Sequence, residues 1–225
     1  KSKNYIEFYN SFSIKKKITA PEGFITRVFL SKNPVQFLKD YKFKHKTLLD
    51  YSCGEGRNIN FFRSLGMKVE GSEIDKSIIL KLRQKFKNTK FFVSSFSTKR
   101  SKFKKYDYVA AVNCVYYVEK NRGIENNLLY LKNFMKKNGY LIISFIGKKH
   151  YVLNKCQYYK KNYAIIRKDN FNFKNGLSVF VASDIISLKK ILTKCGLKLN
   201  IFGEIKDISQ RKTRHLIYCT CTLAD

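Results

Sequence analysis

The chain has 225 residues, of which 44% are hydrophobic, and this length and apolar content suit a single domain with a substantial core. The sequence has no apolar run of about 18 residues and no signal-peptide pattern, so we expect neither a membrane span nor secretion. The formal net charge of +30 would ordinarily indicate a nucleic acid or an anionic membrane as partner.

This positive charge comes mainly from lysine. The chain has 37 Lys but only 9 Arg, and they are spread almost evenly along it. Nucleic-acid binders more often cluster arginine, because its planar guanidinium makes forked contacts to phosphate and guanine that lysine cannot make. We therefore interpret most of the charge as solvated surface, although an excess of this size should still favour a negatively charged substrate.

The six cysteines and three histidines form no C-x-x-C pair and no zinc-binding spacing, so the sequence predicts no metal site. Reduced thiols are typical of the cytoplasm, which is the location that we expect. Four cysteines fall in predicted strands or at strand ends, where cysteine behaves as a small buried hydrophobe: Cys53, Cys114, Cys219 and Cys221.

Residues 1–46 are predicted to form a helical arm that precedes the sheet. Aromatic residues recur at helical spacing from Tyr5 to Phe12, a second segment covers Pro21–Leu30, and a third helix is expected over Pro34–Tyr41. Aromatic residues at this spacing most often pack a core, and we assign that role to them.

The next segment predicts a strand, a glycine turn and a helix. Thr47–Tyr51 has the pattern of a short buried strand, Gly54 and Gly56 form the turn, and an amphipathic helix then ends at Gly66. Glycine permits both the tight turn and the close approach of backbone N–H groups to a ligand at the helix N-terminus.

A second short strand over Met67–Gly71 leads to Glu73. The carboxyl ends of parallel strands meet at one edge of a sheet, so Asp50, the glycine turn and Glu73 should face one crevice. Five of the 16 acidic residues lie within residues 50–75, which supports a site here. A carboxylate at a strand end can accept hydrogen bonds from both ribose hydroxyls, and we assign this role to Glu73.

Two common nucleotide motifs are absent from this turn. Ile59 stands where a dinucleotide fingerprint needs its third glycine, and no Gly-Lys-Ser/Thr of a P-loop is present. The run Asp-Tyr-Ser-Cys-Gly-Glu-Gly at residues 50–56, with Glu73 after the second strand, instead resembles the class I S-adenosylmethionine (SAM)-dependent methyltransferases. Their first motif is commonly written D-x-G-C-G-x-G, and Ser52 replaces its first glycine, so the backbone beside the methionine end of the cofactor should differ.

This resemblance implies a three-layer, doubly wound, Rossmann-like α/β fold with a mostly parallel sheet and a final antiparallel strand. It implies SAM as the cofactor. It also makes Arg27, in the helical arm, a candidate partner for the carboxylate at the methionine end of the cofactor or for an anionic substrate. The other cofactor contacts that it implies around the turn are Asp50, Ser52, Cys53, Gly54, Gly56, Glu73 and Ile74.

A helix over Lys76–Lys87 is expected to return the chain to a strand over Lys90–Val93. The family usually places an aspartate just after this strand, where it accepts a hydrogen bond from the adenine amino group. Ser95 and Phe96 occupy that place here. The resemblance therefore implies that Ser95 and the backbone contact the adenine, with Phe96 against its face.

The segment Tyr106–Tyr117 contains the strand that ends at the methyl-transfer site in the family, and Asn113 is a further cofactor-binding candidate. Asn113-Cys-Val-Tyr116 keeps the Asn and Tyr of the Asn-Pro-Pro-Tyr-type motif of enzymes that methylate base amino groups, but it lacks both prolines. The match does not support base methylation.

Residues 147–182 are predicted to form a lid, because the family often builds its substrate lid after the fifth strand. The Asn-Gly pair at 175–176 predicts a hairpin between Phe171–Phe173 and Leu177–Val181. Tyrosine, histidine and arginine in this region suit a polar, charged ligand, although the tyrosines can equally pack the hairpin.

The remaining elements complete one domain. A helix over Ile124–Lys137 should precede a strand over Asn138–Phe145, and Ser183 is predicted as the N-cap of the helix after the lid. Leu197–Ile205 and Arg214–Leu223 are expected to form the final antiparallel pair. The domain 1–225 thus divides into an arm (1–46), a cofactor-binding core (47–146), a lid (147–182) and a carboxyl-terminal part (183–225).

Methyl transfer from a sulfonium is an in-line displacement, in which the protein mainly aligns the nucleophile, the methyl group and the sulfur. A general base is needed only where the nucleophile is protonated at neutral pH. The candidate catalytic residues are His150, Asp169, His215 and Tyr116.

We expect an enzyme that methylates an O or N atom of a small anionic metabolite, such as a phosphorylated or nucleotide-linked sugar or polar precursor for a surface polysaccharide. The positive charge leaves an RNA methyltransferase as an alternative, which predicts an exposed basic face beside Glu73 and Tyr116 and binding that weakens steeply with salt. A third possibility is a non-catalytic scaffold that retains the fold, and failure to bind the cofactor would support it. The sequence predicts no oligomeric state.

Overall fold

The computed structural model describes residues 43–99, 101–119, 121–167, 176–209 and 212–224. The expected helices of the amino-terminal arm, including Arg27, lie outside the described residues, and so does Asp169.

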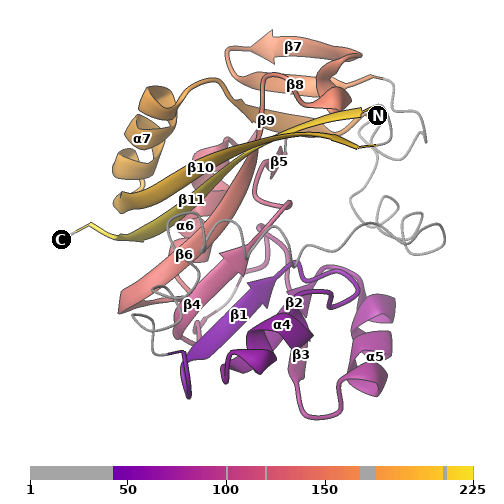
Figure 1. Cartoon of the computed structure of the whole chain (residues 1–225), viewed down its shortest axis with the longest axis vertical. Coiled ribbons are helices and arrows are strands. Elements are labelled where there is room, and N and C mark those ends of the chain that lie inside the picture. The colour runs from indigo at the N-terminus through magenta and orange to yellow at the C-terminus, as the bar shows by residue number, and fades with distance from the viewer. Residues whose placement is uncertain (1–42, 100, 120, 168–175, 210–211, 225) are drawn as a thin grey trace.

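An 11-stranded sheet forms the centre of the molecule (Figure 1). The chain winds outward from β1 in one direction through β2 and β3, then continues on the other side of β1 with β4 and β6. Ligands of open α/β sheets bind where the winding reverses, which here is between β1 and β4. The five parallel strands, in spatial order, are β3 (Lys90–Val93), β2 (Lys68–Glu73), β1 (Thr47–Tyr51), β4 (Tyr106–Ala111) and β6 (Met135–Gly147).

Two long antiparallel strands close the other side of β6. β11 (Lys212–Leu223) pairs with β6 over Leu141–Ile146, and β10 (Leu197–Ser209) pairs with β11. The predicted final antiparallel pair is therefore confirmed, and both strands extend beyond the residues expected from the sequence.

Alternate residues of the central strands enter two separate hydrophobic cores. On β4, Val109 and Ala111 belong to one core, whereas Tyr108 and Ala110 belong to the other. This period of two on strands buried on both faces produces the predicted three-layer arrangement. The first core is covered by α6 (Ile124–Lys132) and α7 (Ile185–Lys194), and the second by α4 (Ile59–Ser64) and α5 (Lys76–Lys85).

A second group of strands extends the sheet beyond the carboxyl end of β4. β9 (Ser178–Ala182) runs parallel to the end of β6 and antiparallel to the short strand β5 (Tyr117–Val118). β8 (Tyr163–Ile166) and β7 (Cys156–Lys160) then follow as an antiparallel hairpin, with β7 last in the strand order (Figure 1). A turn of 3-10 helix, η1 (Tyr151–Leu153), connects β6 to this hairpin.

Of the predicted hairpin between Phe171–Phe173 and Leu177–Val181, the first segment lies outside the described residues. β9 pairs antiparallel with β8 on one side, and its other side is taken by β5 and the end of β6. Within the described residues, the antiparallel partner that precedes β9 in the chain is therefore β8. Gly176 does have the left-handed φ of 81° that a turn residue needs.

Two helix boundaries also differ from the prediction. α6 ends at Lys132 rather than Lys137, because β6 already begins at Met135 and the Tyr106 N–H donates to the carbonyl of Phe134 at 2.8 Å. The N-cap of α7 is Asp184 and not Ser183.

Asp184 caps α7 through its carboxylate. Its Oδ1 accepts from the Ser187 N–H at 2.7 Å, as an N-cap side chain does. The Ser183 hydroxyl instead donates to Asp184 Oδ2 at 2.7 Å, so it supports the cap without being the cap.

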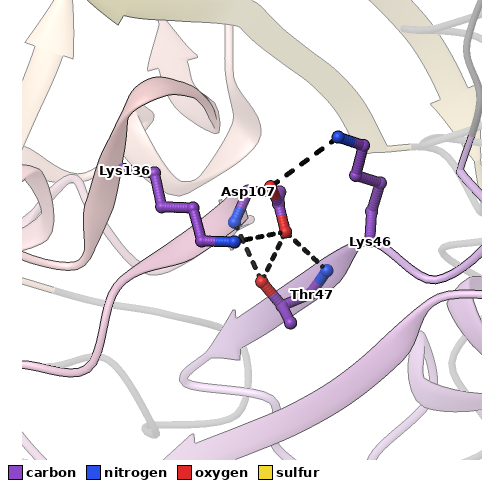
Figure 2. Close-up of polar contacts among 4 residues, drawn as sticks. All are labelled: Lys46, Thr47, Asp107 and Lys136. Carbon is purple, nitrogen blue, oxygen red and sulfur yellow. Dashed lines mark hydrogen bonds and ion pairs between the residues drawn. The ribbon is translucent and has the colours of Figure 1, made fainter.

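At the amino-terminal edge of the sheet, Asp107 links β1 to β4 (Figure 2). Its Oδ2 accepts from the Thr47 N–H at 2.8 Å, the Thr47 hydroxyl at 2.6 Å and Lys136 Nζ at 3.0 Å. Lys46 Nζ lies 3.9 Å from Oδ1. Partial burial opposes ionisation of this carboxyl, but these donors outweigh it and lower the pKa of Asp107 to about 2.

We expect Asp107→Asn to reduce the free energy of unfolding by about 1–3 kcal/mol at pH 7, because the substitution removes charge-assisted hydrogen bonds between two strands. The folded-state pKa of Asp107 lies below its ordinary value, so its contribution is present above about pH 4 and is lost as pH falls toward 2. Urea unfolding at pH 7, 4 and 3 should show the difference between wild type and variant shrinking. Glu119→Gln, in an exposed pair with Arg122, is the control and should change stability by less than about 0.5 kcal/mol. Equal stability of Asp107→Asn and wild type at pH 7 would contradict this account.

Candidate functional site

The turn after β1 is left-handed at three positions. Ser52 has φ 56°, Gly54 has φ 54° and Gly56 has φ 73°. The turn is held to β2 by the Cys53 N–H, which donates to the carbonyl of Ser72 at 2.9 Å. Ser52 occupies a conformation that L-residues rarely adopt, which gives a physical reason why a glycine would suit this position.

The two glycines of the turn serve different purposes. A Cβ on Gly56 would lie 2.6 Å from the Phe86 ring and 2.8 Å from Leu82, so the packing of α5 against the turn requires glycine there. No atom lies within 4 Å of the place where a Cβ of Gly54 would be. Open space therefore borders the backbone at Gly54, where a ligand can approach it closely.

Glu73 ends β2 and is fixed by the backbone of the turn. Its Oε2 accepts from the Gly54 N–H at 2.8 Å, its Oε1 accepts from the Ile74 N–H at 2.6 Å, and its side chain is fully buried. Burial raises the pKa of Glu73 to about 7, although both backbone hydrogen bonds lower it. Each carboxylate oxygen keeps one more lone-pair position for a hydroxyl donor.

Asp50 is the second buried acid of the site. It is 2% exposed, and its Oδ2 has no hydrogen-bond partner. Burial, and then the neighbouring charge of Glu73, raise the pKa of Asp50 to about 8, against a smaller opposing effect of the Asn58 side chain. Within the described ranges, neither Asp50 nor Glu73 forms a salt bridge, so no protein cation stabilises their ionised forms, and a cationic ligand would do so.

The segment after β3 combines a polar residue and an aromatic one. The Ser95 N–H donates to Thr98 Oγ1 at 2.8 Å, and its half-buried hydroxyl lies 3.0 Å from the same atom. The Phe96 ring packs on Tyr51, with ring centroids 4.9 Å apart, and also contacts Tyr130. Phe96 thus joins the core on the α6 side of the sheet.

Asn113 follows β4 with φ 60° and an exposed side chain. Its backbone N–H donates to Ser144 Oγ at 2.7 Å, and the Ser144 hydroxyl donates to Asn113 Oδ1 at 3.3 Å. Tyr116, in contrast, is only 6% exposed and its ring lies 4.7 Å from that of Tyr117. The structure therefore presents Asn113 at the carboxyl edge of the sheet and places Tyr116 in the core.

The two histidines lie together at the carboxyl end of β6, and each is 6% exposed. His150 Nδ1 accepts from the Val152 N–H at 3.3 Å and caps η1. His215 Nδ1 accepts from the Lys149 N–H at 3.0 Å, and its Nε2 faces the carboxylate of Glu204. Both rings therefore hold backbone in place.

The structure brings together around one turn the residues that the sequence assigned to the cofactor there. His150, His215 and Tyr116 are buried and none of them belongs to this turn, and Arg27 and Asp169 lie outside the described residues. The residues assembled at the turn are Asp50, Ser52, Cys53, Gly54, Gly56, Glu73 and Ile74.

Sequence reasoning missed two polar residues that support the site. Asn58 lies against Asp50. It is the residue just before the first helical residue of α4, and the preference for Asn at helix N-caps could have identified it from the sequence. Ser144 is fully buried and orients Asn113. A single serine inside the apolar run of β6 was its only sequence signal.

Among the described residues, no group of three or more His, Cys, Asp or Glu side chains is arranged to hold a metal ion. No helix in the described part of the chain is both long and apolar enough to cross a membrane.

A family model described as a methyltransferase domain matches residues 26–199. No curated protein matches the chain at a significant level.

Solved structures show the same fold. A SAM-dependent methyltransferase of Methanosarcina mazei has 14% identity and a TM-score of 0.67, with 84% of this chain and 97% of that chain covered. Magnesium protoporphyrin IX methyltransferase of Synechocystis, with bound S-adenosylhomocysteine (SAH), has 15% identity and a TM-score of 0.65, with 98% and 94% covered. The 1,6-didemethyltoxoflavin-N1-methyltransferase of Burkholderia thailandensis, with bound 1,6-didemethyltoxoflavin and SAH, has 12% identity and a TM-score of 0.61, with 94% of both chains covered. At these identities the likeness concerns the fold alone.

Proposed function

The chain belongs to the methyltransferase-domain family and uses SAM, and we propose that it methylates an O or N atom of a small anionic molecule. The observation that best supports SAM binding at this site is the pair of buried acids, Asp50 and Glu73, beside the open glycine turn. The cofactor supplies a methyl group on a positively charged sulfur. The residues around the turn then have to hold that cofactor and leave the methyl group facing the acceptor.

The proposed cofactor roles follow from the hydrogen bonds already made. Glu73, fixed by the Gly54 and Ile74 N–H groups, accepts hydrogen bonds from the ribose hydroxyls through its free lone pairs. Asp50, with an unpartnered Oδ2 in a buried place, favours a cationic group of the ligand. The open space at Gly54 lets the ligand approach the backbone.

The charge around the acceptor side supports an anionic substrate. Between Glu125 and Asp169 the sequence contains no Asp or Glu. Lys148 and Lys149 are exposed directly after β6, which continues past the residue that pairs with the end of β4. A positive potential there would raise the local concentration of anionic acceptors.

The environment of the histidines supports an acceptor that needs no general base. His150 and His215 both use Nδ1 to accept a backbone N–H, and both are buried. A phosphate or carboxylate oxygen, or an amine near its pKa, is already able to attack without losing a proton first.

The test is calorimetric titration with SAH, followed by methyl transfer from labelled SAM to a panel of sugar phosphates, nucleotide sugars and their neutral parent compounds. We expect micromolar SAH binding and turnover only with anionic members of the panel. Absence of SAH binding would refute the proposed enzyme and favour a scaffold. Equal turnover of the neutral parents would refute the anionic substrate class.

A further inference from the structure

The segment that contains the β7–β8 hairpin has an unusual charge distribution. Residues 148–167 include six Lys and Arg and no Asp or Glu. All six cations are exposed, and none forms a salt bridge with a described acid. They are Lys148, Lys149, Lys155, Lys160, Lys161 and Arg167.

Aromatic side chains lie among these cations. Tyr158 is 53% exposed and Tyr159 is 37% exposed, and both belong to β7, which ends the strand order. The Tyr159 ring lies 6.2 Å from the ring of Tyr163 on β8, and Lys160 Nζ lies 5.7 Å from the Tyr163 ring. We call Tyr158, Tyr159, Lys160 and Lys161 the β7 surface.

We propose that the β7 surface binds single-stranded nucleic acid. Lys160 and Lys161, exposed at the end of β7 and in the turn after it, can neutralise phosphates, and exposed tyrosine rings provide platforms on which bases stack. Small-molecule sites are concave and bury most of their ligand, whereas these tyrosines lie exposed on the last strand of a sheet, which suits a polymer.

This inference goes beyond the proposed function, because the β7 surface is separate from the glycine turn. It connects to the acceptor side through β8 and β9, since β9 pairs with β5 and with the end of β6. A nucleic-acid strand bound on the β7 surface would therefore lie on the extension of the sheet that begins at β5, just after Asn113 and Tyr116 in the chain.

The test is fluorescence anisotropy with a labelled single-stranded RNA of mixed sequence at several salt concentrations. Tyr158→Ala/Tyr159→Ala should weaken binding about tenfold or more, whereas Tyr158→Phe/Tyr159→Phe should keep it, because phenylalanine still stacks. Lys160→Gln/Lys161→Gln should weaken binding and reduce the slope of log affinity against log salt by about 1.4, since two phosphate contacts are lost.

The matched control is Lys189→Gln/Lys190→Gln, which removes the same charge from exposed positions on α7. It should change RNA affinity much less than the β7 variants. The proposal is overturned if the α7 variant weakens binding equally, if Tyr158→Ala/Tyr159→Ala leaves it unchanged, or if polyphosphate of equal charge competes as well as RNA. Binding to phosphatidylserine vesicles that the β7 variants abolish, without binding of the wild type to RNA, would also overturn it, because the surface would then bind a membrane.

SAH binding distinguishes this proposal from the proposed function. Each β7 variant should bind SAH like the wild type, which also shows that the variant is folded. A Glu73→Gln variant should lose SAH affinity and keep RNA affinity. RNA binding without SAH binding would refute the proposed methyltransferase function and support nucleic-acid binding by the β7 surface. SAH binding without RNA binding would support the proposed function and refute nucleic-acid binding by the β7 surface.

Discussion

Replacing Glu73 with glutamine should weaken SAH binding by about 10- to 100-fold, which corresponds to a loss of about 1.5–3 kcal/mol for hydrogen bonds to a charged group. Both carboxylate oxygens already accept backbone N–H groups, from Gly54 and Ile74. Glutamine has one oxygen, so its amide NH₂ must face one of these two donors in a fully buried place. The substitution therefore disturbs the turn and also removes the charge that would accept the ribose hydroxyls.

Glu70→Gln is the control for this measurement, because it is the same substitution in the same strand. Glu70 lies toward the other end of β2 and accepts from the Tyr106 hydroxyl at 2.7 Å and from Lys104. Calorimetry with SAH at pH 8 should show near wild-type affinity for Glu70→Gln. A folded Glu73→Gln protein, judged by circular dichroism, that binds SAH as tightly as wild type would rule out the role assigned to Glu73.

The features of the site that could be predicted from the sequence are those fixed by residues close together in the chain: the first strand, the glycine turn and the acid at the end of the second strand. Thr47–Tyr51 forms β1 as expected, because a short apolar run before a glycine turn has few alternatives. Gly54 and Gly56 both have left-handed φ, and Glu73 meets the turn because parallel strands end at one edge. The cysteines predicted as buried hydrophobes, such as Cys219 and Cys221, are indeed fully buried.

The part that the sequence did not predict depends on tertiary contacts. In the β7–β8 hairpin, β8 pairs with β9 over Tyr163–Ile165, and Ala164 and Ile166 are fully buried there. This short segment follows exposed Tyr and Lys residues, so its periodicity is too weak to identify a strand before its partner is known. The same applies to α6, whose helical pattern continues past Lys132 while the chain already enters β6 at Met135.

The affinity for SAM should rise with pH between about 6 and 8, because the ligand carries a sulfonium charge and the buried acids must ionise to balance it. In the ligand-free protein the pKa of Asp50 is raised to about 8 and that of Glu73 to about 7. Below its pKa each acid is mostly protonated, so binding of a cation must expel a proton. Affinity should therefore fall about tenfold per pH unit for each proton released.

Asp50→Asn tests which acid is responsible and links binding to stability. The folded-state pKa of Asp50 lies above its ordinary value of 3.8, so the ionised carboxyl destabilises the fold and wild-type stability should decrease as pH rises from 4 to 8. Asp50→Asn should remove this decrease in stability, so thermal unfolding at pH 9 should show the variant to be more stable than wild type. Its affinity for SAM should be lower than that of wild type and should vary less with pH. The measurement is calorimetric titration with SAM from pH 6 to 9. A wild-type affinity that does not change with pH would contradict the coupling between SAM binding and ionisation of the buried acids. If the slope of affinity against pH is the same in Asp50→Asn as in wild type, the proton that is released on binding comes from Glu73. A buried carboxyl that costs stability but improves binding is what a site for a cation requires, because the same burial that raises its pKa strengthens its attraction to the ligand.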